Sequence, residues 1–448
     1  MYLPYTDFLV YGLKKSGISA ADFLLKRGAS VWLFDDDKNN YEISAVKNLV
    51  ARGAKIKEDE NALDGIDAMV LSPGVPIDSP LNIEAKSRGI KIISELMLGA
   101  SYVTEPMVAV TGTNGKTTTC SLISSILCGA KINNKLVGNV GTPITKVVDD
   151  IKRGDIIVTE VSSFQMEATN RFLPHIAVIL NVTPDHLERH YTFENYAFLK
   201  CKMLMNLTET EYAVINADDE TVKSFATKTR GKVVWFSLNE KVDGAYLSDG
   251  YIYFLDEKII AEKDVNLIGE HNLSNVLAAV AVLKLLGLDG KEIESGIKGF
   301  RGVKHRVELV RELDGVEYYN DSKATNPDAV IKAVNSIKRP VTIILGGYDK
   351  GLDYAPAFIE IKKSKKVRHI VITGANAKKV YDAACAEGFE SVSVLSDFKS
   401  AVITARGLAK GGEAVLLSPG TSGFDNFSGY EERGDKFIEI VKSFKQST

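Results

Sequence analysis

The chain has 448 residues, of which 45% are hydrophobic and 25% are charged, and its formal net charge at pH 7 is −3. This length exceeds one ordinary domain core, so we expect two or three domains of ordinary globular composition. The near-neutral charge gives no general attraction for nucleic acid or for an anionic membrane. Any polyanionic ligand must therefore be captured locally, by loops and helix ends, and we expect no nucleic-acid partner.

The cysteines and the apolar segments indicate the cellular compartment in which the protein is expected. The four cysteines lie apart without CxxC pairing, which argues against a disulfide framework and against a cysteine zinc site. Residues 1–7 lack a basic stretch followed by an apolar core, so a signal peptide is not expected. No apolar run reaches the roughly 20 residues that a membrane-spanning helix needs. We expect a cytoplasmic protein without membrane insertion.

The first hundred residues alternate strand and helix. An apolar strand at 8–11 ends in a glycine turn, a helical pattern runs to residue 27, and a second strand at 31–34 is followed by an acidic cluster. A third strand at 68–71 enters Ser72-Pro73-Gly74. This βαβ pattern is typical of a dinucleotide-type fold. The glycines are too few for a cofactor fingerprint, so a turn that only connects strand to helix explains these residues equally well.

Residues 108–119 read Val-Ala-Val-Thr-Gly-Thr-Asn-Gly-Lys-Thr-Thr-Thr, a β-branched strand that enters a glycine-bracketed turn and opens a helix. The amides of such a turn and the helix N-terminus can hold phosphates. Lys116 would reach the terminal phosphates, and the Thr117 hydroxyl would ligate Mg²⁺. Gly112 and Gly115 enclose two residues rather than the usual four, and a plain turn could look similar. Gly-Lys-Thr directly after a buried strand favours an ATP site.

The rest of the chain continues the alternation. After a break near residues 104–106, strands are expected at 156–159, 176–180, 213–215 and 233–236, followed by a hairpin across 247–252 and a helix at 274–286. Beyond residue 303, strands are expected at 341–345, 369–372 and 414–417. Continuous apolar strands between helices indicate parallel sheets covered on both faces. We predict an α/β fold with three domains in series: residues 1–104, 105–303 and 304–448.

Polar residues follow the strands of the second domain. Glu160 ends the strand at 156–159 and, at the carboxyl edge of a parallel sheet, can ligate the Mg²⁺ of the phosphate loop. The alternative is a surface carboxylate that caps the next turn. Asp185 and His186 leave the following strand in the same way, which is compatible with a second Mg²⁺, although a single histidine is more often structural. His190 is expected to be solvated.

At two further positions in this domain an ordinary structural role is an alternative to a functional one. Lys200 and Lys202 lie on a predicted helix after Tyr196, and the ordinary interpretation is two exposed lysines. Asn272 precedes the alanine-rich helix and could contact the edge of adenine, since its amide both donates and accepts. Asparagine is also a favoured helix cap, so structure alone could explain it.

Three strand ends of the third domain carry polar side chains. Residues 320–327 place Asp, Ser, Lys, Thr and Asn together where a helix begins, a setting that binds anions. Lys350 follows the strand at 341–345, and residues 418–423 follow the strand at 414–417. Together these hydroxyls and lysines would suit a small carboxylate.

Four motifs occur in the order found in the ATP-dependent Mur ligases, which add amino acids to the peptidoglycan precursor. The chain resembles that family in Gly-Thr-Asn-Gly-Lys-Thr-Thr (112–118), Asn-Val-Thr-Pro-Asp-His (181–186), Gly-Glu-His-Asn-Leu-Ser-Asn (269–275) and Asn-Asp-Ser-Lys-Ala-Thr-Asn (320–326). The resemblance covers the whole chain. Ser-Pro-Gly at 418–420 and Tyr-Glu-Glu-Arg-Gly at 430–434 are most similar to the D-glutamate-adding branch. The Asp-Asn-Pro-Arg-type motif associated with diaminopimelate- and lysine-adding members is absent from the sequence.

The resemblance implies a Rossmann-like N-terminal UDP-binding domain, a central P-loop ATPase domain with a mostly parallel sheet, and a C-terminal Rossmann-like α/β domain. It implies a ligase that joins D-glutamate to UDP-N-acetylmuramoyl-L-alanine through an acyl phosphate, with ATP and two Mg²⁺ ions. We expect a monomer.

The resemblance also implies residue roles. Lys116, His186 and Lys200 would be catalytic, and Lys200 matches the lysine that the family carbamylates. The metal ligands would be Thr117, Glu160, His186 and Lys200. ATP would bind to Gly112, Thr113, Asn114, Gly115, Lys116, Thr117, Thr118, Asn272, Arg306 and Asp321.

For the substrates, the UDP group would be held by Gly12, Ser16, Asp35, Ser72, Pro73 and Gly74, and the muramoyl group by Asn139. D-Glutamate would be held by Lys323, Thr325, Lys350, Ser418, Ser422 and Tyr430. One position departs from the family pattern: Gly423 stands where a serine is expected, so Thr421 or Ser422 would have to supply the hydroxyl.

Other functions remain open on the sequence alone. A sibling Mur ligase or a folylpolyglutamate-type ligase would use another amino acid. A non-catalytic nucleotide-dependent binding protein would be expected to have lost its metal ligands, yet Lys116, Glu160, His186 and Lys200 are present. A nucleic-acid motor fits less well, because no basic stripe occurs.

Overall fold

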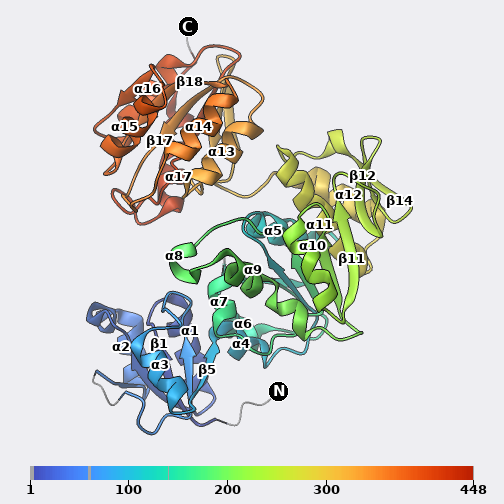
Figure 1. The fold of residues 1–448 in the computed structure, drawn as a ribbon, viewed down its shortest axis with the longest axis vertical. Coiled ribbons are helices and arrows are strands. Elements are labelled where there is room, and N and C mark those ends of the chain that lie inside the picture. Colours follow the sequence, from blue (N-terminus) through green and yellow to red (C-terminus); the bar gives the residue numbers. More distant parts are fainter. Residues whose placement is uncertain (1–4, 59–61, 140, 447–448) are drawn as a thin grey trace. The chain divides into compact units, whose positions relative to one another are not determined.

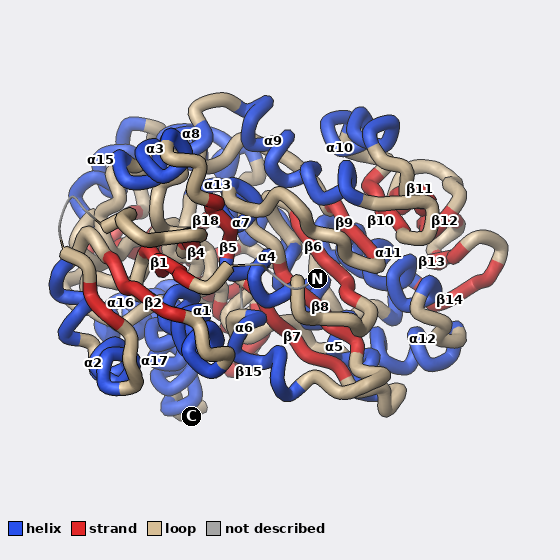
Figure 2. The backbone as a smooth tube through the Cα atoms, turned by 90° about the horizontal axis from the view of Figure 1, so that it is seen from below, coloured by secondary structure: helices blue, strands red, loops and turns tan. Residues whose placement is uncertain are grey.

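The computed structural model describes residues 5–58, 62–139 and 141–446, which form two compact units (Figure 1). The first unit comprises Met1–Val265 and Leu273–Phe300, and the second comprises Asn266–Asn272 and Arg301–Thr448. Within the described residues the first unit contains two sheets and the second contains one. Helices flank the strands of each sheet (Figure 2), so the predicted α/β class is confirmed.

The N-terminal sheet of the first unit is parallel, with the strand order β3-β2-β1-β4-β5. Its strands are β1 (Asp7–Tyr11), β2 (Ser30–Phe34), β3 (Lys55–Ile56), β4 (Ala68–Leu71) and β5 (Lys91–Ser94), with helices α1 (Lys15–Lys26), α2 (Ser44–Ala51), α3 (Pro80–Ser87) and α4 (Glu95–Ala100). Alternate residues of β1 enter two separate apolar clusters, Val10 in one and Leu9 in the other. Both faces of the sheet are therefore covered, as the continuous apolar strand predicted.

The central sheet of the first unit has the order β14-β13-β12-β11-β10-β9-β6-β8-β7. Its strands are β6 (Met107–Thr111), β7 (Asn134–Gly138), β8 (Ile156–Glu160), β9 (Ile176–Ile179), β10 (Tyr212–Asn216), β11 (Lys232–Ser237), β12 (Gly244–Ser248), β13 (Tyr251–Phe254) and β14 (Glu257–Ala261). It is parallel from β7 to β12. The predicted hairpin joins β12 to β13, and β14, which was not predicted, pairs with β13, both in antiparallel orientation. The sheet is thus mostly parallel, as predicted.

Helices of the central region connect these strands or follow the last of them. They are α5 (Lys116–Gly129), α6 (Ile144–Val147), α7 (Ser163–Glu167), α8 (Leu187–His190), α9 (Phe193–Cys201), α10 (Glu220–Ser224), α11 (Glu270–Leu285) and α12 (Gly290–Gly299). Short 3-10 helices lie at Lys38–Glu42, Val148–Asp150, Lys202–Asn206, Phe225–Lys228 and Glu262–Asp264. Across the described part of the chain, no helix combines the length and the apolar character that a bilayer crossing requires.

The sheet of the second unit has the order β15-β16-β20-β17-β18-β19. Its strands are β15 (Glu308–Leu313), β16 (Val316–Asn320), β17 (Val341–Leu345), β18 (Val367–Ile372), β19 (Val392–Val394) and β20 (Ala414–Leu417), and only β15 pairs in antiparallel orientation. Its helices are α13 (Pro327–Ser336), α14 (Ala355–Lys363), α15 (Ala377–Ala386), α16 (Phe398–Leu408) and α17 (Tyr430–Ser443). Helices α13, α14 and α15 contribute to the apolar cluster on one face, whereas α16 and α17 contribute to the other. Because β16, β20 and β17 are neighbours, the three polar strand ends lie at one edge.

Candidate active site

The turn between β6 and α5 adopts a backbone that requires glycine. Gly112 has φ +154° and Gly115 has φ +88°, and Gly115 caps the N-terminus of α5. A Cβ on Gly115 would lie 2.1 Å from Asn275 Oδ1, and a Cβ on Gly112 would lie 3.0 Å from Leu180 Cβ. Side chains are thus excluded from both positions, and the backbone stays open to a ligand at the start of a helix of 14 residues.

Asn181, the first residue of the Asn-Val-Thr-Pro-Asp-His motif, fixes the conformation of this turn. Its Oδ1 accepts a hydrogen bond from Asn114 N at 2.9 Å, and its Nδ2 donates to Asn114 O at 3.1 Å. Its carbonyl oxygen also accepts from Thr113 N at 2.9 Å. No role was predicted for Asn181 alone, although its place directly after a buried strand was an available signal.

Two lysines converge on the same turn. Lys116 Nζ donates to Gly112 O at 2.7 Å and to Thr113 O at 2.9 Å, and Lys200 Nζ donates to Gly112 O at 2.8 Å. Lys200 is only 2% exposed, so its interpretation as a surface lysine is wrong. Burial first, and the charge of Lys116 second, lower the pKa of Lys200 well below its usual range. Lys202 is half-buried and donates to Met166 O at 3.1 Å, so it is not an exposed lysine either.

Glu160 lies beside the turn at residues 112–115, which we name the phosphate turn, and its carboxylate is shared by two neighbours. Its Oε2 accepts from Thr117 Oγ1 at 2.8 Å, and its Oε1 accepts from Asn139 Nδ2 at 3.0 Å. At 2% exposure it is not the surface carboxylate of the alternative interpretation. A carboxylate and a hydroxyl oxygen at the end of a phosphate turn are the hard ligands that Mg²⁺ prefers. Val140, next to Asn139 in its predicted motif, lies outside the described residues.

A metal at this place would not be held by protein carboxylates and imidazoles alone. Among the described residues no group of three or more His, Cys, Asp or Glu side chains gathers at one point. Mg²⁺ commonly keeps water and substrate phosphates as ligands, so the pair Thr117 and Glu160 fits a shared nucleotide-bound cation.

The two histidines after β9 have opposite environments. The His186 side chain is 44% exposed, with Nε2 3.6 Å from Asp185 Oδ2. His190 is 1% exposed, so the prediction that it is solvated is wrong. Its ring stacks on Phe164 at 5.3 Å between centroids, and its Nε2 lies 3.0 Å from Ser163 Oγ. Burial lowers the pKa of His190 to about 4, so this ring is neutral at physiological pH.

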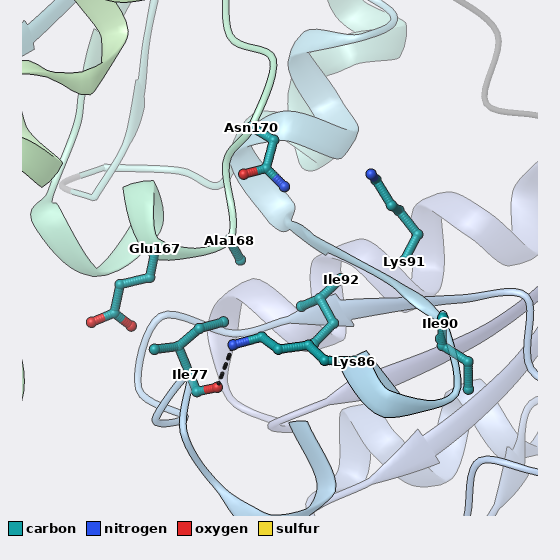
Figure 3. Close-up of a pocket in the computed structure, with 9 residues that line it drawn as sticks. Ile77, Lys86, Ile90, Lys91, Ile92, Glu167, Ala168 and Asn170 are labelled. Carbon is teal, nitrogen blue, oxygen red and sulfur yellow. Dashed lines mark hydrogen bonds between the residues drawn. The ribbon is translucent and has the colours of Figure 1, made fainter. Parts of the chain in front are cut away.

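Next to His190, Glu167 and Arg189 form an ion pair with distances of 3.1 Å from Nε and 2.6 Å from Nη2. A pocket of about 330 Å³ lies beside Glu167 (Figure 3). Its rim includes Lys86, whose Nζ donates to Ile77 O at 3.3 Å. None of the residues predicted to bind ATP, metal or substrate lines this pocket.

The predicted UDP residues meet at the carboxyl edge of the N-terminal sheet. Ser72 Oγ donates to Gly12 O at 2.6 Å, and Leu13 N donates to Asp35 Oδ2 at 2.5 Å. Gly12 has φ +93°, and a Cβ there would lie 2.8 Å from Ser72 Cβ. The strand order reverses between β1 and β4, a place where α/β sheets bind ligands. Ser16 lies in the first turn of α1, half-buried, while Pro73 and Gly74 follow Ser72, with Gly74 exposed.

In the second unit, Asp321 follows β16 as a buried carboxylate. Its Oδ2 accepts from Ser418 Oγ at 2.9 Å, and its Oδ1 accepts from Val307 N at 3.2 Å. Burial raises the pKa of Asp321 to about 7, against the opposing charge of Arg306. The hydroxyl of Ser418 is therefore directed at a protein carboxylate. Asn272 is 6% exposed, and its Nδ2 donates to Ile268 O at 2.8 Å.

The other residues predicted for D-glutamate lie in the loops at this same edge. Lys323 Nζ lies 5.5 Å from the centre of the Tyr430 ring, and Lys350 Nζ donates to Thr325 O at 3.4 Å. The alternatives proposed for the missing hydroxyl are both turned inward. Thr421 Oγ1 donates to Tyr348 O at 2.5 Å, and the Ser422 hydroxyl is buried without a hydrogen-bond partner.

One buried residue at this edge was missed. Arg433, the fourth residue of α17, is 2% exposed and donates to Ser322 Oγ, Ser322 O and Thr421 O. Arg433 belongs to the Tyr-Glu-Glu-Arg-Gly motif, but no role was predicted for it from the sequence. Two acidic neighbours in the sequence made a solvated helix turn the ordinary interpretation.

Taken together, a glycine-bracketed turn at a helix N-terminus on a mostly parallel sheet, with two further α/β sheets in the chain, defines a P-loop nucleotide-binding class of protein. Comparison with known families agrees in all three regions. Residues 6–94 match the MurD-like N-terminal domain of Mur ligases, residues 110–283 the Mur ligase middle domain, and residues 305–421 the Mur ligase glutamate ligase domain. The chain belongs to the Mur ligase family.

Full-length relatives support this membership. The chain is 41% identical over 446 residues to the UDP-N-acetylmuramoylalanine–D-glutamate ligase of Pelotomaculum thermopropionicum, with 98% of each chain covered. It is 40% identical to the enzyme of the same name from Clostridioides difficile, with 99% of this chain and 100% of the relative covered.

Solved structures agree with the fold. The crystal structure of UDP-N-acetylmuramate-alanine ligase from Thermotoga maritima matches with a TM-score of 0.58 at 19% identity, covering 98% of this chain and 100% of that one. MurF from Acinetobacter baumannii matches with a TM-score of 0.62 at 15% identity, covering 92% and 91%. At such identities these structures support the three-domain α/β fold alone.

Proposed function

We propose that this protein is an ATP-dependent ligase that joins D-glutamate to UDP-N-acetylmuramoyl-L-alanine in peptidoglycan precursor synthesis. The full-length similarity to ligases of that name carries the choice of substrates. The observation that supports an ATP-dependent reaction is the phosphate turn, where Lys116, Thr117 and Glu160 lie together at the N-terminus of α5.

The proposed reaction has two steps. The acceptor carboxylate attacks the γ-phosphorus of ATP, and ADP leaves, which gives an acyl phosphate. The amine of D-glutamate then attacks the activated carbonyl, and phosphate leaves from the tetrahedral intermediate with loss of a proton. The protein contributes positioning and neutralisation of charge, for which the turn amides and Lys116 are suited.

Mur ligases depend on ATP and generally use Mg²⁺, which neutralises phosphate charge. We propose Thr117 and Glu160 as ligands of one ion. We propose His186 and a carbamylated Lys200 as ligands of a second. The depressed pKa of Lys200 supports carbamylation, because the neutral amine is the form that adds to carbon dioxide.

The remaining assignments are proposals of the same kind. Asn272, Arg306 and Asp321 are further nucleotide contacts. The residues around Gly12 and Ser72, with Asn139, serve the UDP-muramoyl substrate, and those around Lys323 and Lys350 serve D-glutamate. We also propose domain boundaries after residues 104 and 303 and a monomeric enzyme in the cytoplasm.

To test this proposal, the protein is incubated with ATP, Mg²⁺, UDP-N-acetylmuramoyl-L-alanine and one amino acid at a time from a panel. Phosphate release and product mass are measured for each amino acid. We expect D-glutamate to give the amide product with a kcat/KM well above that of any other amino acid. Preference for a different amino acid would indicate a sibling ligase. ATP binding without amide formation for any acceptor would indicate a non-catalytic binding protein.

A further inference from the structure

Arg433 is a buried cation whose hydrogen bonds go to neutral acceptors. Its guanidinium donates to Ser322 Oγ at 3.0 Å, Ser322 O at 2.9 Å and Thr421 O at 2.8 Å. Within residues 5–58, 62–139 and 141–446, no carboxylate forms an ion pair with it, and its Nη1 is buried without a partner. Arginine is seldom buried without a paired charge, so this arrangement calls for an explanation.

The guanidinium lies where the loops after three neighbouring strands meet. Its bonds to Ser322 and Thr421 join the loops that follow β16 and β20. The loop after β17 is attached to the second of these, since Tyr348 N donates to Ser422 O at 3.0 Å. A Cβ on Gly347 would lie 2.9 Å from Arg433 Nη1, so this loop also packs directly on the guanidinium.

These loops carry the side chains proposed for D-glutamate. Lys323 and Thr325 follow β16, Lys350 follows β17, and Ser422 follows β20. One side chain from α17 therefore joins the loops after β16 and β20 and packs against the loop after β17. Loss of the guanidinium would leave its buried oxygen acceptors on Ser322 and Thr421 without these hydrogen bonds. The loops could then move apart.

The charge of Arg433 has a second consequence. Burial lowers its pKa to about 10, so the guanidinium stays protonated at neutral pH. The charges of Asp425, Tyr354 and Asp321 oppose this shift. A charge that no ion pair neutralises projects a positive potential through the low-dielectric loops above it. Such a potential favours a substrate with more than one carboxylate.

On the basis of the proposed function, we infer that Arg433 is a positioning residue for the amino-acid substrate. By holding the loops after β16, β17 and β20 together over an unneutralised charge, it sets the affinity for a dicarboxylic amino acid without contacting it. This role lies outside the nucleotide and metal sites of the first unit.

The test compares Arg433→Met and Arg433→Lys with the wild-type enzyme, varying D-glutamate at saturating ATP and UDP-N-acetylmuramoyl-L-alanine. We expect Arg433→Met to raise the KM for D-glutamate at least about tenfold while the KM for ATP stays within about twofold. Arg433→Lys keeps the charge but loses the planar fork, so its KM should lie between those of the wild type and the Met variant.

The matched control is Arg311→Met. The Arg311 guanidinium also donates to main-chain carbonyls of α17 and the residue beyond it, at the opposite end of the helix, with distances of 3.4 Å to Val441 O and 3.3 Å to Phe444 O. It should leave the KM for D-glutamate unchanged. A purely structural Arg433 would instead show a lower Tm and kcat with an unchanged KM for D-glutamate, and that pattern would overturn the inference.

Equilibrium dialysis with labelled D-glutamate separates this inference from the proposed function. If the wild-type protein forms no amide, the proposed function fails. Weaker binding of labelled D-glutamate to Arg433→Met or Arg433→Lys than to wild type and Arg311→Met would still support the inference. Equal binding by all four proteins, or no D-glutamate binding by any, would overturn it.

Discussion

Lys116 and Lys200 donate hydrogen bonds to the same acceptor, the carbonyl oxygen of Gly112, at 2.7 and 2.8 Å. Two ammonium groups on one oxygen repel each other, and the buried one loses its proton more readily. The structure therefore favours the neutral amine for Lys200, which is the form that the proposed carbamylation requires.

Replacing Lys200 by methionine should lower the ligation rate by about 100-fold or more, because a proposed metal ligand and its charge are lost. If Lys200 acts as a carbamate, a small carboxylate can partly replace it. We expect acetate to raise the rate of Lys200→Met and to leave the wild type unaffected. Phosphate release measured with and without acetate checks this.

The neighbouring Lys202→Met is the control, because that side chain donates to Met166 O rather than to the phosphate turn. It should keep near-native turnover. Full activity of Lys200→Met without acetate would contradict the assignment.

Gly115→Ala should destroy nucleotide binding. Its backbone has φ +88°, and a Cβ would collide with Asn275 Oδ1, so the turn must change shape to admit a methyl group. Gly129→Ala is the matched control, since it lies at the end of the same helix with no atom within 4 Å of the added Cβ. Calorimetric titration with ADP and Mg²⁺ should show binding for Gly129→Ala alone. Equal affinities would mean that the nucleotide lies elsewhere.

Most of the fold could be predicted because its central strands are continuous apolar runs. The strands that escaped prediction are short or polar. β3 has two residues, β19 has three and β5 has four, while β7 reads Asn-Lys-Leu-Val-Gly, β14 reads Glu-Lys-Ile-Ile-Ala and β15 reads Glu-Leu-Val-Arg-Glu-Leu. Their pairing depends on a neighbouring strand already in place, which a local pattern does not contain.

The site was predictable to the extent that its residues follow strands. Glu160 was predicted at the ligand edge of the sheet because it ends an apolar strand, whereas the nucleotide role of Asp321 came from the family resemblance. His190 and Arg433 could not be placed, because their burial is decided by Phe164 in one case and by loops distant in the sequence in the other. Residue type and local spacing predict exposure for both.

Lys116→Ala should abolish amide formation, with a loss of about 1000-fold or more in kcat, because the cation proposed to neutralise the transferred phosphate is removed. Lys228→Ala is the control, as an exposed lysine of the same unit. Both variants should unfold at similar temperatures, so that the difference reports chemistry. Product formation by Lys116→Ala at a near-native rate would reject the ATP site.

The buried carboxyl of Asp321 should give the second unit a pH-dependent stability. The pKa of Asp321 is raised by burial from the ordinary 3.8 to about 7, so between these values the folded state holds a proton that the unfolded state releases. The unfolding free energy should therefore fall with rising pH across this window, at a slope of up to about 1.4 kcal/mol per pH unit. Asp321→Asn cannot titrate and should lack this fall.

Urea unfolding of wild type and Asp321→Asn between pH 4 and pH 7 measures the difference directly. His190, whose pKa is lowered to about 4, titrates with the opposite sign but is present in both proteins, so its contribution cancels. Ser418→Ala removes the hydroxyl that donates to Asp321 and opposes the shift, so it should extend the fall to higher pH. If wild type and Asp321→Asn show parallel pH profiles, Asp321 is ionised in the folded protein, and its carboxylate would be exposed to solvent or paired with Arg306.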